Sequence, residues 1–276
     1  MKSTFYLTLV AAIGLSTISS PGQRSLDMGV FFGVSHYMGD LQRSHIEVLE
    51  LHQARGLFLR YNTGKVFSLR AHLYQGTISG DDGNYPTIEK AWQRNLSFRS
   101  HLYEVGLVGE LNFLNFGMSN RHGSKRLVGH KASAYLFGGV AGFHFNPQAL
   151  YDGQWHNLQP LGTEGQGMEG HAAKYQLYQI ALPLGFGFKI RPGKFACFGV
   201  EVGFRKTFTD YLDDVSGHYP DRRLLHETNP LAAALSWRGL EADAGLSGPP
   251  EELRGNPAGK DMYLFAGLSL AITLGK

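Results

Sequence analysis

The sequence predicts an all-β fold: an eight-stranded antiparallel transmembrane β-barrel of the outer-membrane type, with short periplasmic turns and long extracellular loops. Three observations predict it. Large apolar residues alternate with small or polar ones over long runs, the connections between these runs alternate in length, and only 18% of the residues are charged. Alternation over ten or more residues indicates a strand that separates two environments. The mean hydropathy of −0.19 agrees with a barrel, because its two faces average out.

The first 22 residues have the features of a signal peptide. Lys2 gives a basic start, an apolar run extends from Phe5 to Leu15, and small polar residues follow. This run is shorter than the about 20 residues that a membrane-crossing helix needs. We therefore expect a cleaved signal peptide over residues 1–22 and an outer-membrane β-barrel domain over residues 23–276. An uncleaved anchor is the alternative.

Eight strands are expected from the alternating runs. Between residues 176 and 190 the even positions are mostly large and apolar, and the odd positions are mostly small or polar. The next run repeats the pattern, and the four residues 191–194 (RPGK) between them form a hairpin turn. The expected strands lie near residues 27–35, 54–62, 66–78, 97–113, 132–145, 174–190, 195–209 and 261–274.

The connections alternate in length along the chain. Residues 62–65 and 191–194 are short, and residues 114–131 are intermediate. Long connections are expected at residues 36–53, 79–96, 146–173 and 210–260. This alternation is the layout of an outer-membrane barrel, in which short turns face the periplasm and long loops face outward. Both termini then lie at the short-turn end, and the first strand pairs with the last.

Charged residues of the expected strands fall on the small-residue face. Facing hydrocarbon, an Arg or Lys would cost about 2–4 kcal/mol, so this face is predicted to line the barrel interior. An interior charge network is expected from Arg60, Arg70, Glu104, Glu110, Glu201 and Arg205. Eight strands leave room only for side chains inside, which predicts a plugged lumen. A soluble lipocalin-like barrel, with its apolar face inward, is the competing fold.

Aromatic and histidine side chains add two further expectations. Seven tyrosines near the strand ends are interpreted as aromatic girdles at the membrane surfaces: Tyr61, Tyr74, Tyr103, Tyr135, Tyr175, Tyr178 and Tyr263. His101 and His144 fall on strands and are placed where they can meet inside the barrel.

The long loops contain the carboxylates that could carry chemistry. Asp210, Asp213 and Asp214 are clustered, and such a cluster can bind Ca²⁺, act as general acid and base, or order a loop by capping backbone amides. Their spacing matches no ion-binding loop, so an ordered outer loop is expected. No zinc-protease motif, nucleophile elbow or complete phosphate loop is present, and the single Cys197 excludes a disulfide within the chain. We expect no catalytic residue, no metal and no cofactor.

The predicted short-turn end is basic. Its positive residues include Arg121, Lys125, Arg126, Lys131, Arg191 and Lys194. Two interpretations stay open: these residues meet lipid phosphates, or they form a docking face for a periplasmic partner. The formal net charge of the whole chain is only +3, so composition gives no case for nucleic-acid binding.

Several sequence blocks together resemble one family. They are residues 33–41 (GVSHYMGDL), 76–82 (GTISGDD), 94–98 (RNLSF), 158–167 (LQPLGTEGQG), 205–217 (RKTFTDYLDDVSG) and 254–256 (RGN). In this order they resemble the PorG-like, DUF6089-like outer-membrane barrel proteins of the type IX secretion system. The ending, residues 273–276 (TLGK), departs from general barrel proteins because it lacks a terminal aromatic residue.

The resemblance implies a function and partners. It implies a non-enzymatic component that anchors or positions a periplasmic ring, built from a lipoprotein and its soluble partner, at the outer membrane. Outer-membrane lipid is the other expected partner. Two alternatives stay open: a surface hydrolase that uses Asp210, Asp213 or Asp214, and a passive surface or adhesin barrel.

Overall fold

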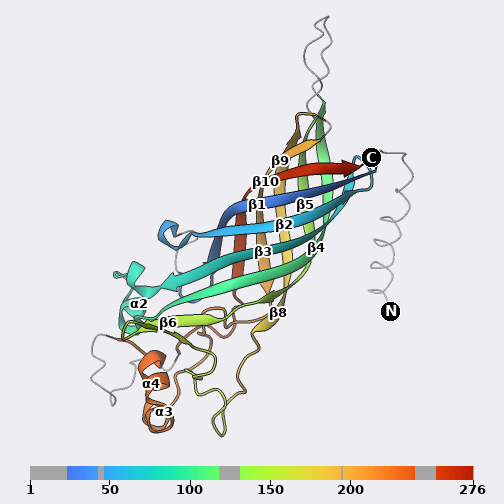
Figure 1. Ribbon diagram of the computed structural model, residues 1–276. Helices are drawn as coiled ribbons and strands as arrows, with labels where there is room; N and C mark the ends of the chain where they lie inside the picture. Colours follow the sequence, from blue (N-terminus) through green and yellow to red (C-terminus); the bar gives the residue numbers. More distant parts are fainter. Residues whose placement is uncertain (1–23, 43–46, 118–130, 194, 240–252, 276) are drawn as a thin grey trace, which may run out of the picture.

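The chain folds into a closed antiparallel β-barrel (Figure 1). The computed structural model describes residues 24–42, 47–117, 131–193, 195–239 and 253–275. Eight strands form the barrel wall in the order β1, β2, β3, β4, β5, β8, β9 and β10, and β10 returns to pair with β1. The predicted fold class is confirmed. The expected signal peptide, residues 1–22, lies outside the described residues.

The observed strands agree with the expected ones to within about four residues at each end. They are β1 (Ser25–Met38), β2 (His52–Asn62), β3 (Phe67–Asp81), β4 (Ser97–Gly117), β5 (Lys131–His144), β8 (Tyr178–Arg191), β9 (Ala196–Thr207) and β10 (Met262–Gly275). Leu26 of β1 lies opposite Gly275 of β10, so the described ends of the chain meet at the same end of the barrel. The turn between β2 and β3 lies there too, because Asn62 pairs with Ser25.

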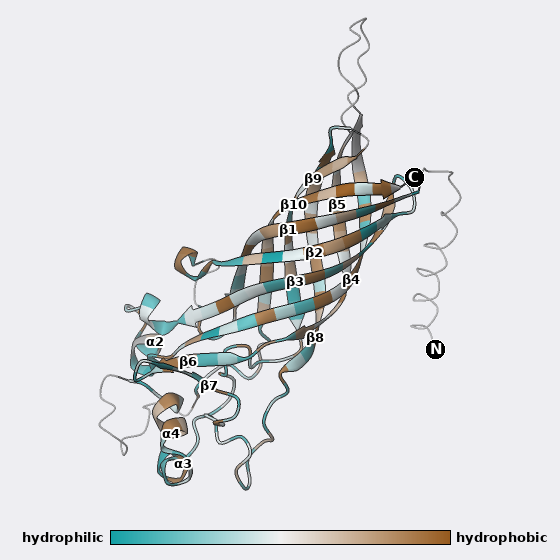
Figure 2. Cartoon of the chain, in the orientation of Figure 1, coloured by the Kyte–Doolittle hydropathy of each residue, from teal (hydrophilic) through white to brown (hydrophobic). Residues whose placement is uncertain are grey.

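The outer wall is apolar and the interior is polar. In β8 the side chains of Ile180, Leu184 and Phe186 are exposed, whereas Lys189 is buried. Figure 2 shows brown segments alternating with white or teal ones along the strands of the wall. This arrangement is the reverse of a soluble lipocalin-like barrel, which places its large apolar residues inside.

The predicted tyrosine girdle is correct only in part. Tyr61, Tyr103 and Tyr178 are exposed on the outer wall. Four of the seven are instead buried inside the molecule: Tyr74, Tyr135, Tyr175 and Tyr263. The interpretation relied on position along the strand, but the face is set by the two-residue period, and Tyr74, Tyr135 and Tyr263 share the inward face with the charged residues.

The long connections contain additional structure that the sequence did not predict. A hairpin of β6 (Pro147–Tyr151) and β7 (Gln154–Asn157) continues the wall beside β4, and Arg99 of β4 lies opposite Gln148 of β6. The helices are α2 (Glu89–Arg94), α3 (Arg222–Thr228) and α4 (Pro230–Ser236), and the 3₁₀ helices are η1 (Val48–Glu50) and η2 (Asp82–Asn84). Among the described residues, no helix is long and apolar enough to cross a bilayer.

The two helices of the longest loop begin at clear capping residues. The Asp221 side chain accepts hydrogen bonds from the Arg223 and Leu224 amides, which starts α3. The Asn229 side chain accepts from the Ala232 amide, and Pro230 follows it at the first position of α4. Buried Ala232, Ala233 and Leu225 hold the two helices together. These loops gather at the end of the barrel opposite the short turns (Figure 1).

Candidate functional site

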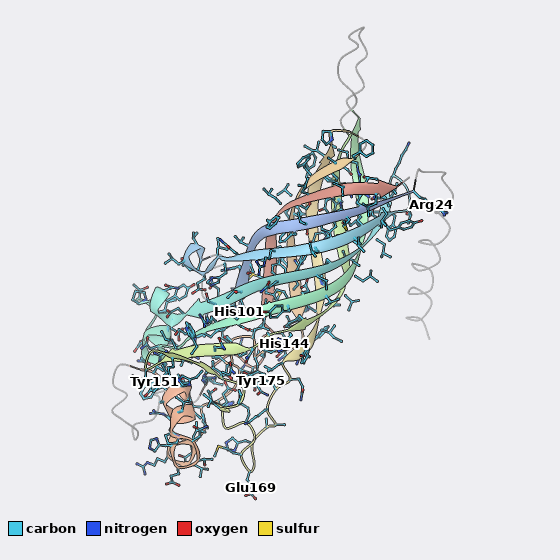
Figure 3. The ribbon with its side chains drawn as sticks, viewed as in Figure 1. Arg24, His101, His144, Tyr151, Glu169 and Tyr175 are labelled. Atoms are coloured by element: carbon cyan, nitrogen blue, oxygen red, sulfur yellow. The ribbon has the colours of Figure 1, made fainter. Side chains whose placement is uncertain are left out.

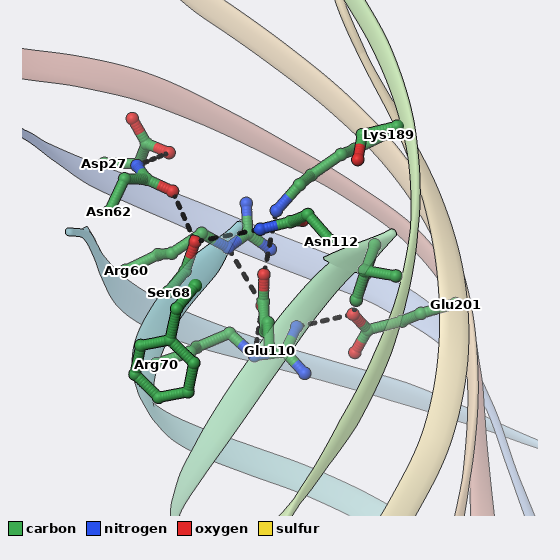
Figure 4. A network of polar contacts seen from close by, with 12 residues as sticks. Asp27, Arg60, Asn62, Ser68, Arg70, Glu110, Asn112, Lys189 and Glu201 are labelled. Carbon is green, nitrogen blue, oxygen red and sulfur yellow. Dashed lines mark hydrogen bonds and ion pairs between the residues drawn. The ribbon is translucent and has the colours of Figure 1, made fainter. Parts of the chain in front are cut away.

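The barrel interior nearest the short turns is filled by buried ion pairs (Figure 4). Glu110 of β4 accepts hydrogen bonds from Arg60 Nε and Lys189 Nζ, both at 2.9 Å, and lies 3.3 Å from Arg70 Nε. Arg70 also donates to Glu201 of β9 at 2.5 Å. The carboxylates therefore join strands from opposite sides of the barrel. Such groups are stable only when they are paired, because an unpaired buried charge is very costly.

A second interior layer surrounds Glu104. Its carboxylate lies 3.2 Å from Arg205 Nε, 2.7 Å from His72 Nε2 and 2.7 Å from the Tyr263 hydroxyl, which donates to it. Rings of Phe31, Tyr74 and Phe265 pack together at centroid distances of 4.7 to 6.4 Å, and Tyr74 lies opposite Glu104. Ionic and aromatic side chains together therefore occupy the lumen.

The structure places all six residues of the predicted interior network inside the barrel. They fall into two groups: Arg60, Arg70, Glu110 and Glu201 lie in one layer, and Glu104 and Arg205 lie in the other. Sequence reasoning missed Lys189, His72, Tyr135 and Tyr263. The strand period could have found three of them: His72 lies two residues from Arg70, and Lys189 and Tyr263 lie on the small-residue faces of their strands. It could not have placed Tyr135, because the two faces of β5 differ too little in residue size.

The short-turn end is closed by a polar clasp. Asp27 of β1 accepts hydrogen bonds from Asn62 at 2.9 Å and from Thr273 at 2.8 Å, and it also pairs with Arg191 of β8. Arg191 donates in addition to the Thr273 hydroxyl at 3.0 Å. The clasp therefore ties the seam between the first and last strands to β8.

The predicted docking residues are placed only in part. Arg191 belongs to the clasp, and Lys131 begins β5 at the short-turn end. Arg121, Lys125, Arg126 and Lys194 lie outside the described residues. The docking role of all six stays a prediction.

The opposite end of the barrel is sealed by its own long loops, which we call the loop-end plug: described residues 39–42, 82–96, 158–177, 208–237 and 253–261. Arg94 is one centre of it. Its guanidinium donates to the Asp82 carboxylate at 2.8 Å, to the Arg254 carbonyl at 2.7 Å and to the Asp40 carbonyl at 2.9 Å. One buried side chain thus connects three loops.

Arg254 is the second centre of the plug. Its guanidinium donates to Glu164 at 3.2 Å, to the Ser236 carbonyl at 3.0 Å and to the Asp214 carbonyl. Glu164 in turn accepts from the amides of Ser216 and Gly217. The loop that carries Glu164 turns sharply at Gly162 and Gly165, whose φ angles of 68° and 80° suit glycine.

The three predicted outer-loop carboxylates are buried within the plug. The Asp214 side chain accepts from the Tyr175 hydroxyl at 2.7 Å and from Thr163, and Asp210 accepts from the Ser216 hydroxyl at 2.6 Å. Burial raises the pKa of Asp214 to about 6, although the Arg254 guanidinium opposes the shift. The carboxylate oxygens of Asp210 and Asp214 thus accept hydrogen bonds that hold the loops together.

Within the plug, the carboxylates of Asp213 and Asp261 form an acidic pair around one tyrosine hydroxyl. The Tyr37 hydroxyl donates to Asp213 Oδ2 at 2.6 Å and lies 3.3 Å from Asp261 Oδ1. The Val215 amide donates to the other Asp213 oxygen, and the Leu212 amide donates to Asp261. Burial, and next the negative charge of Asp40, raise the pKa of Asp213; burial and Asp213 raise the pKa of Asp261.

The plug gathers the sequence blocks that carry the family resemblance. Arg94 meets Asp82, and Arg254 meets Glu164. The Asn256 amide donates to Asp40 at 2.9 Å. These contacts join residues up to 216 positions apart, so the sequence alone did not show that the blocks form one site.

The prediction that His101 and His144 meet inside the barrel is wrong. His101 is exposed on the outer wall and shares a hydrogen bond of 3.0 Å with the Thr77 hydroxyl. The His144 ring packs against the exposed Tyr178 ring, with 4.7 Å between the two ring centroids. Figure 3 shows both histidines on the outer side of the ribbon. In the described part of the chain, no group of three or more His, Cys, Asp or Glu residues is arranged to hold a metal ion.

The fold and the side chains inside it define a class of protein. It is a closed eight-stranded barrel with an apolar outer wall and an interior filled by ion pairs, and its long loops close one end. Within this class, the chain belongs to the family described as "Domain of unknown function (DUF6089)", whose model matches residues 5–229. No curated protein matches the sequence.

Solved structures of small outer-membrane proteins are similar to this chain at low identity. Ail, the attachment invasion locus protein of Yersinia pestis, in complex with the heparin analogue sucrose octasulfate, is 8% identical with a TM-score of 0.41; the match covers 91% of this chain and 99% of Ail. Neisserial surface protein A is 6% identical with a TM-score of 0.40, covering 91% and 99%. OprG from Pseudomonas aeruginosa is 10% identical with a TM-score of 0.35, covering 91% and 95%.

Proposed function

We propose that this chain is a non-enzymatic, plugged barrel of the bacterial outer membrane that anchors a periplasmic ring complex of the type IX secretion system. The ring partners are a lipoprotein and its soluble companion. The short-turn end faces the periplasm and carries the contact, and the loop-end plug faces outward.

The sealed interior is the observation that carries the proposal. Arg60, Arg70 and Glu110 fill the barrel on one side, and the loops held by Arg94 and Arg254 close the other. A molecule that spans a membrane and has no open lumen is suited to hold other proteins in place. The apolar outer wall supports the membrane location, because this face matches the lipid-facing side of barrels.

The direction of the contact rests on charge and on the family resemblance. The short-turn end is rich in Lys and Arg over residues 121–131 and 191–194. Positive groups there attract an acidic protein surface or the lipid phosphates beside it. Asp210, Asp213 and Asp214 are buried and hydrogen-bonded, which gives the hydrolase alternative no accessible carboxylate pair.

Site-specific photo-cross-linking in cells tests the proposal. A photoreactive residue replaces Lys65, which is exposed in the turn between β2 and β3. The matched control replaces exposed Arg223 of α3 at the opposite end. We expect the ring lipoprotein or its soluble partner to be linked from position 65 and not from position 223. A chain that reaches the outer membrane intact and links no periplasmic protein from position 65 would contradict the proposal.

A further inference from the structure

An outward-facing polar patch lies where the apolar wall of β3 and β4 ends on the loop side. Along β4 the outward residues change from Val105 and Tyr103 to His101 and then Arg99. Their neighbours on β3 are Gln75, which lies opposite Tyr103, and Thr77, which lies opposite His101. The surface thus passes from aliphatic to aromatic to basic, which is the order from hydrocarbon to headgroup in a bilayer.

The β6–β7 hairpin widens this patch. Arg99 lies opposite Gln148 of β6, and Gln148 lies opposite Asn157 of β7, so the three side chains share one face. The Gln148 amide donates to Asn157 Oδ1 at 2.7 Å. Figure 1 shows β6 running beside the loop-side end of β4. Amide side chains beside an aromatic ring provide donors and acceptors for sugar hydroxyls.

Arg99 is held in place but lacks a full set of acceptors. Its guanidinium carbon lies 3.4 Å from the ring centroid of Trp155, a short cation–π contact that fixes the side chain. Its Nε atom is buried and has no hydrogen-bond partner within the described part of the chain. Asp81, at the end of β3, accepts from the Gly83 amide, and no ion pair joins it to Arg99 among the described residues. The Arg99 side chain is half-exposed and forms no hydrogen bond or ion pair among the described residues, and of its nitrogens only Nε is buried. Its terminal Nη donors are therefore open to a phosphate.

We propose that this patch, formed by Arg99 and His101 of β4, Thr77 of β3, Gln148 of β6 and the Trp155 ring of β7, binds the phosphorylated headgroup of a glycolipid in the outer leaflet. Arg99 contacts a phosphate, Gln148 and Asn157 contact sugar hydroxyls, and the acyl chains lie along the apolar wall below Tyr103. The inference rests on the proposed outer-membrane location but not on the secretion role.

Native mass spectrometry of the full chain in detergent micelles tests the site. The protein is offered equal amounts of bis-phosphorylated lipid A and the same lipid with both phosphates removed. We expect wild type to retain the phosphorylated form at least about fivefold over the other, the factor for one basic side chain at a charged membrane surface. Arg99→Gln should bring this ratio close to one. The matched control Arg223→Gln, at an exposed arginine of α3, should leave it unchanged.

Each other outcome overturns the inference. Equal retention of the two lipids, or an unchanged ratio in Arg99→Gln, removes the phosphate contact. Displacement of the lipid by millimolar inorganic phosphate would make the patch a site for a soluble anion. A protein that copurifies with wild type and is lost with Arg99→Gln, while the lipid ratio is one, would assign the patch to a protein partner. Failure of the position-65 cross-link does not change any of these readouts, so the two proposals fail separately.

Discussion

At the scale of single residues, the carboxylates of the loop-end plug are of two kinds. Asp82 and Glu164 pair directly with Arg94 and Arg254. Asp213 and Asp261 instead share the hydroxyl of Tyr37 and accept backbone amides. Burial and a neighbouring carboxylate both disfavour the charged form, so they raise the pKa values of Asp213 and Asp261 above the ordinary value.

The raised pKa values of the buried plug carboxyls predict that the free energy of unfolding depends on pH. The pKa values of Asp213 and Asp214 are raised above the unfolded value, Asp214 to about 6. The folded chain therefore binds more protons than the unfolded chain at intermediate pH. Stability from these groups is complete below about pH 4 and is lost as pH rises through the folded pKa values. The free energy of unfolding should fall from pH 5 to pH 8.

The variant Asp213→Asn should make that fall shallower, because one titrating group is removed while an oxygen stays to accept from Tyr37. A single proton contributes at most about 1.4 kcal/mol per pH unit. Urea unfolding followed by tryptophan fluorescence, to which Trp237 buried in the plug contributes, measures the slope. Exposed Glu169→Gln is the control and should keep the wild-type slope. Identical slopes in Asp213→Asn and wild type would show that Asp213 does not hold an extra proton.

At the scale of elements, large inward side chains of one strand lie opposite glycines of the next strand, so that the ring packs against the glycine backbone. Tyr135 of β5, Gly187 of β8 and Glu201 of β9 lie in one register row. The Tyr135 ring lies over Gly187, and its hydroxyl donates to Glu201 at 2.7 Å. In the next row Phe137 lies opposite Gly185, which lies opposite Gly203. The many inward glycines are therefore places where a neighbour's ring lies against the backbone.

The variant Gly187→Ala should destabilise the barrel. A Cβ atom there would lie 2.7 Å from Tyr135 Cε1, closer than real contacts allow. Overpacking of this kind costs about 1–3 kcal/mol. The control is Gly142→Ala, because Gly142 faces outward with no atom within 4 Å of a built Cβ. Urea midpoints in micelles compare the two, and equal midpoints would mean that the Tyr135 ring can move aside without loss.

The long strands could be predicted from the sequence, whereas the short elements and the faces of several tyrosines could not. The strands were predictable because alternation is a local signal, repeated every second residue along β8, β9 and β10. The β6–β7 hairpin and the short helices were missed because their runs have only four to seven residues. Four of the seven tyrosines were misassigned because a girdle and an interior ring both prefer aromatic residues near strand ends, and only the face separates them.

At the scale of the whole molecule, the filled interior predicts that the barrel does not conduct ions. Side chains of Arg70, Glu110 and Glu201 meet across the lumen, and the plug covers the other mouth. Eight strands leave an interior that side chains alone can fill. Reconstituted into planar bilayers, the full chain should give no unitary current steps, while a general porin tested in the same way should. Regular steps from the pure chain would contradict the sealed interior.

The loop-end plug could be predicted only as separate parts. The sequence identified Asp210, Asp213 and Asp214 as one ordered loop, since these residues are neighbours in the chain. It could not show that Arg254 joins that loop to Glu164, because the latter contact spans 90 residues and has no periodic signal. Side-chain contacts between loops depend on where the barrel places each strand end.

The pairing of β1 with β10 sets the order in which the molecule can assemble. Each other barrel strand pairs with the next barrel strand along the chain, whereas this one pairing joins the two ends of the polypeptide. Closing a longer loop costs more chain entropy, and distant contacts form more slowly. The hairpins should therefore form first and the β1–β10 junction last. Until then β1 and β10 each have one unpaired edge, and such edges can pair with other chains and cause aggregation. The contact of Arg191 with Asp27 and Thr273 can form only when that junction is complete.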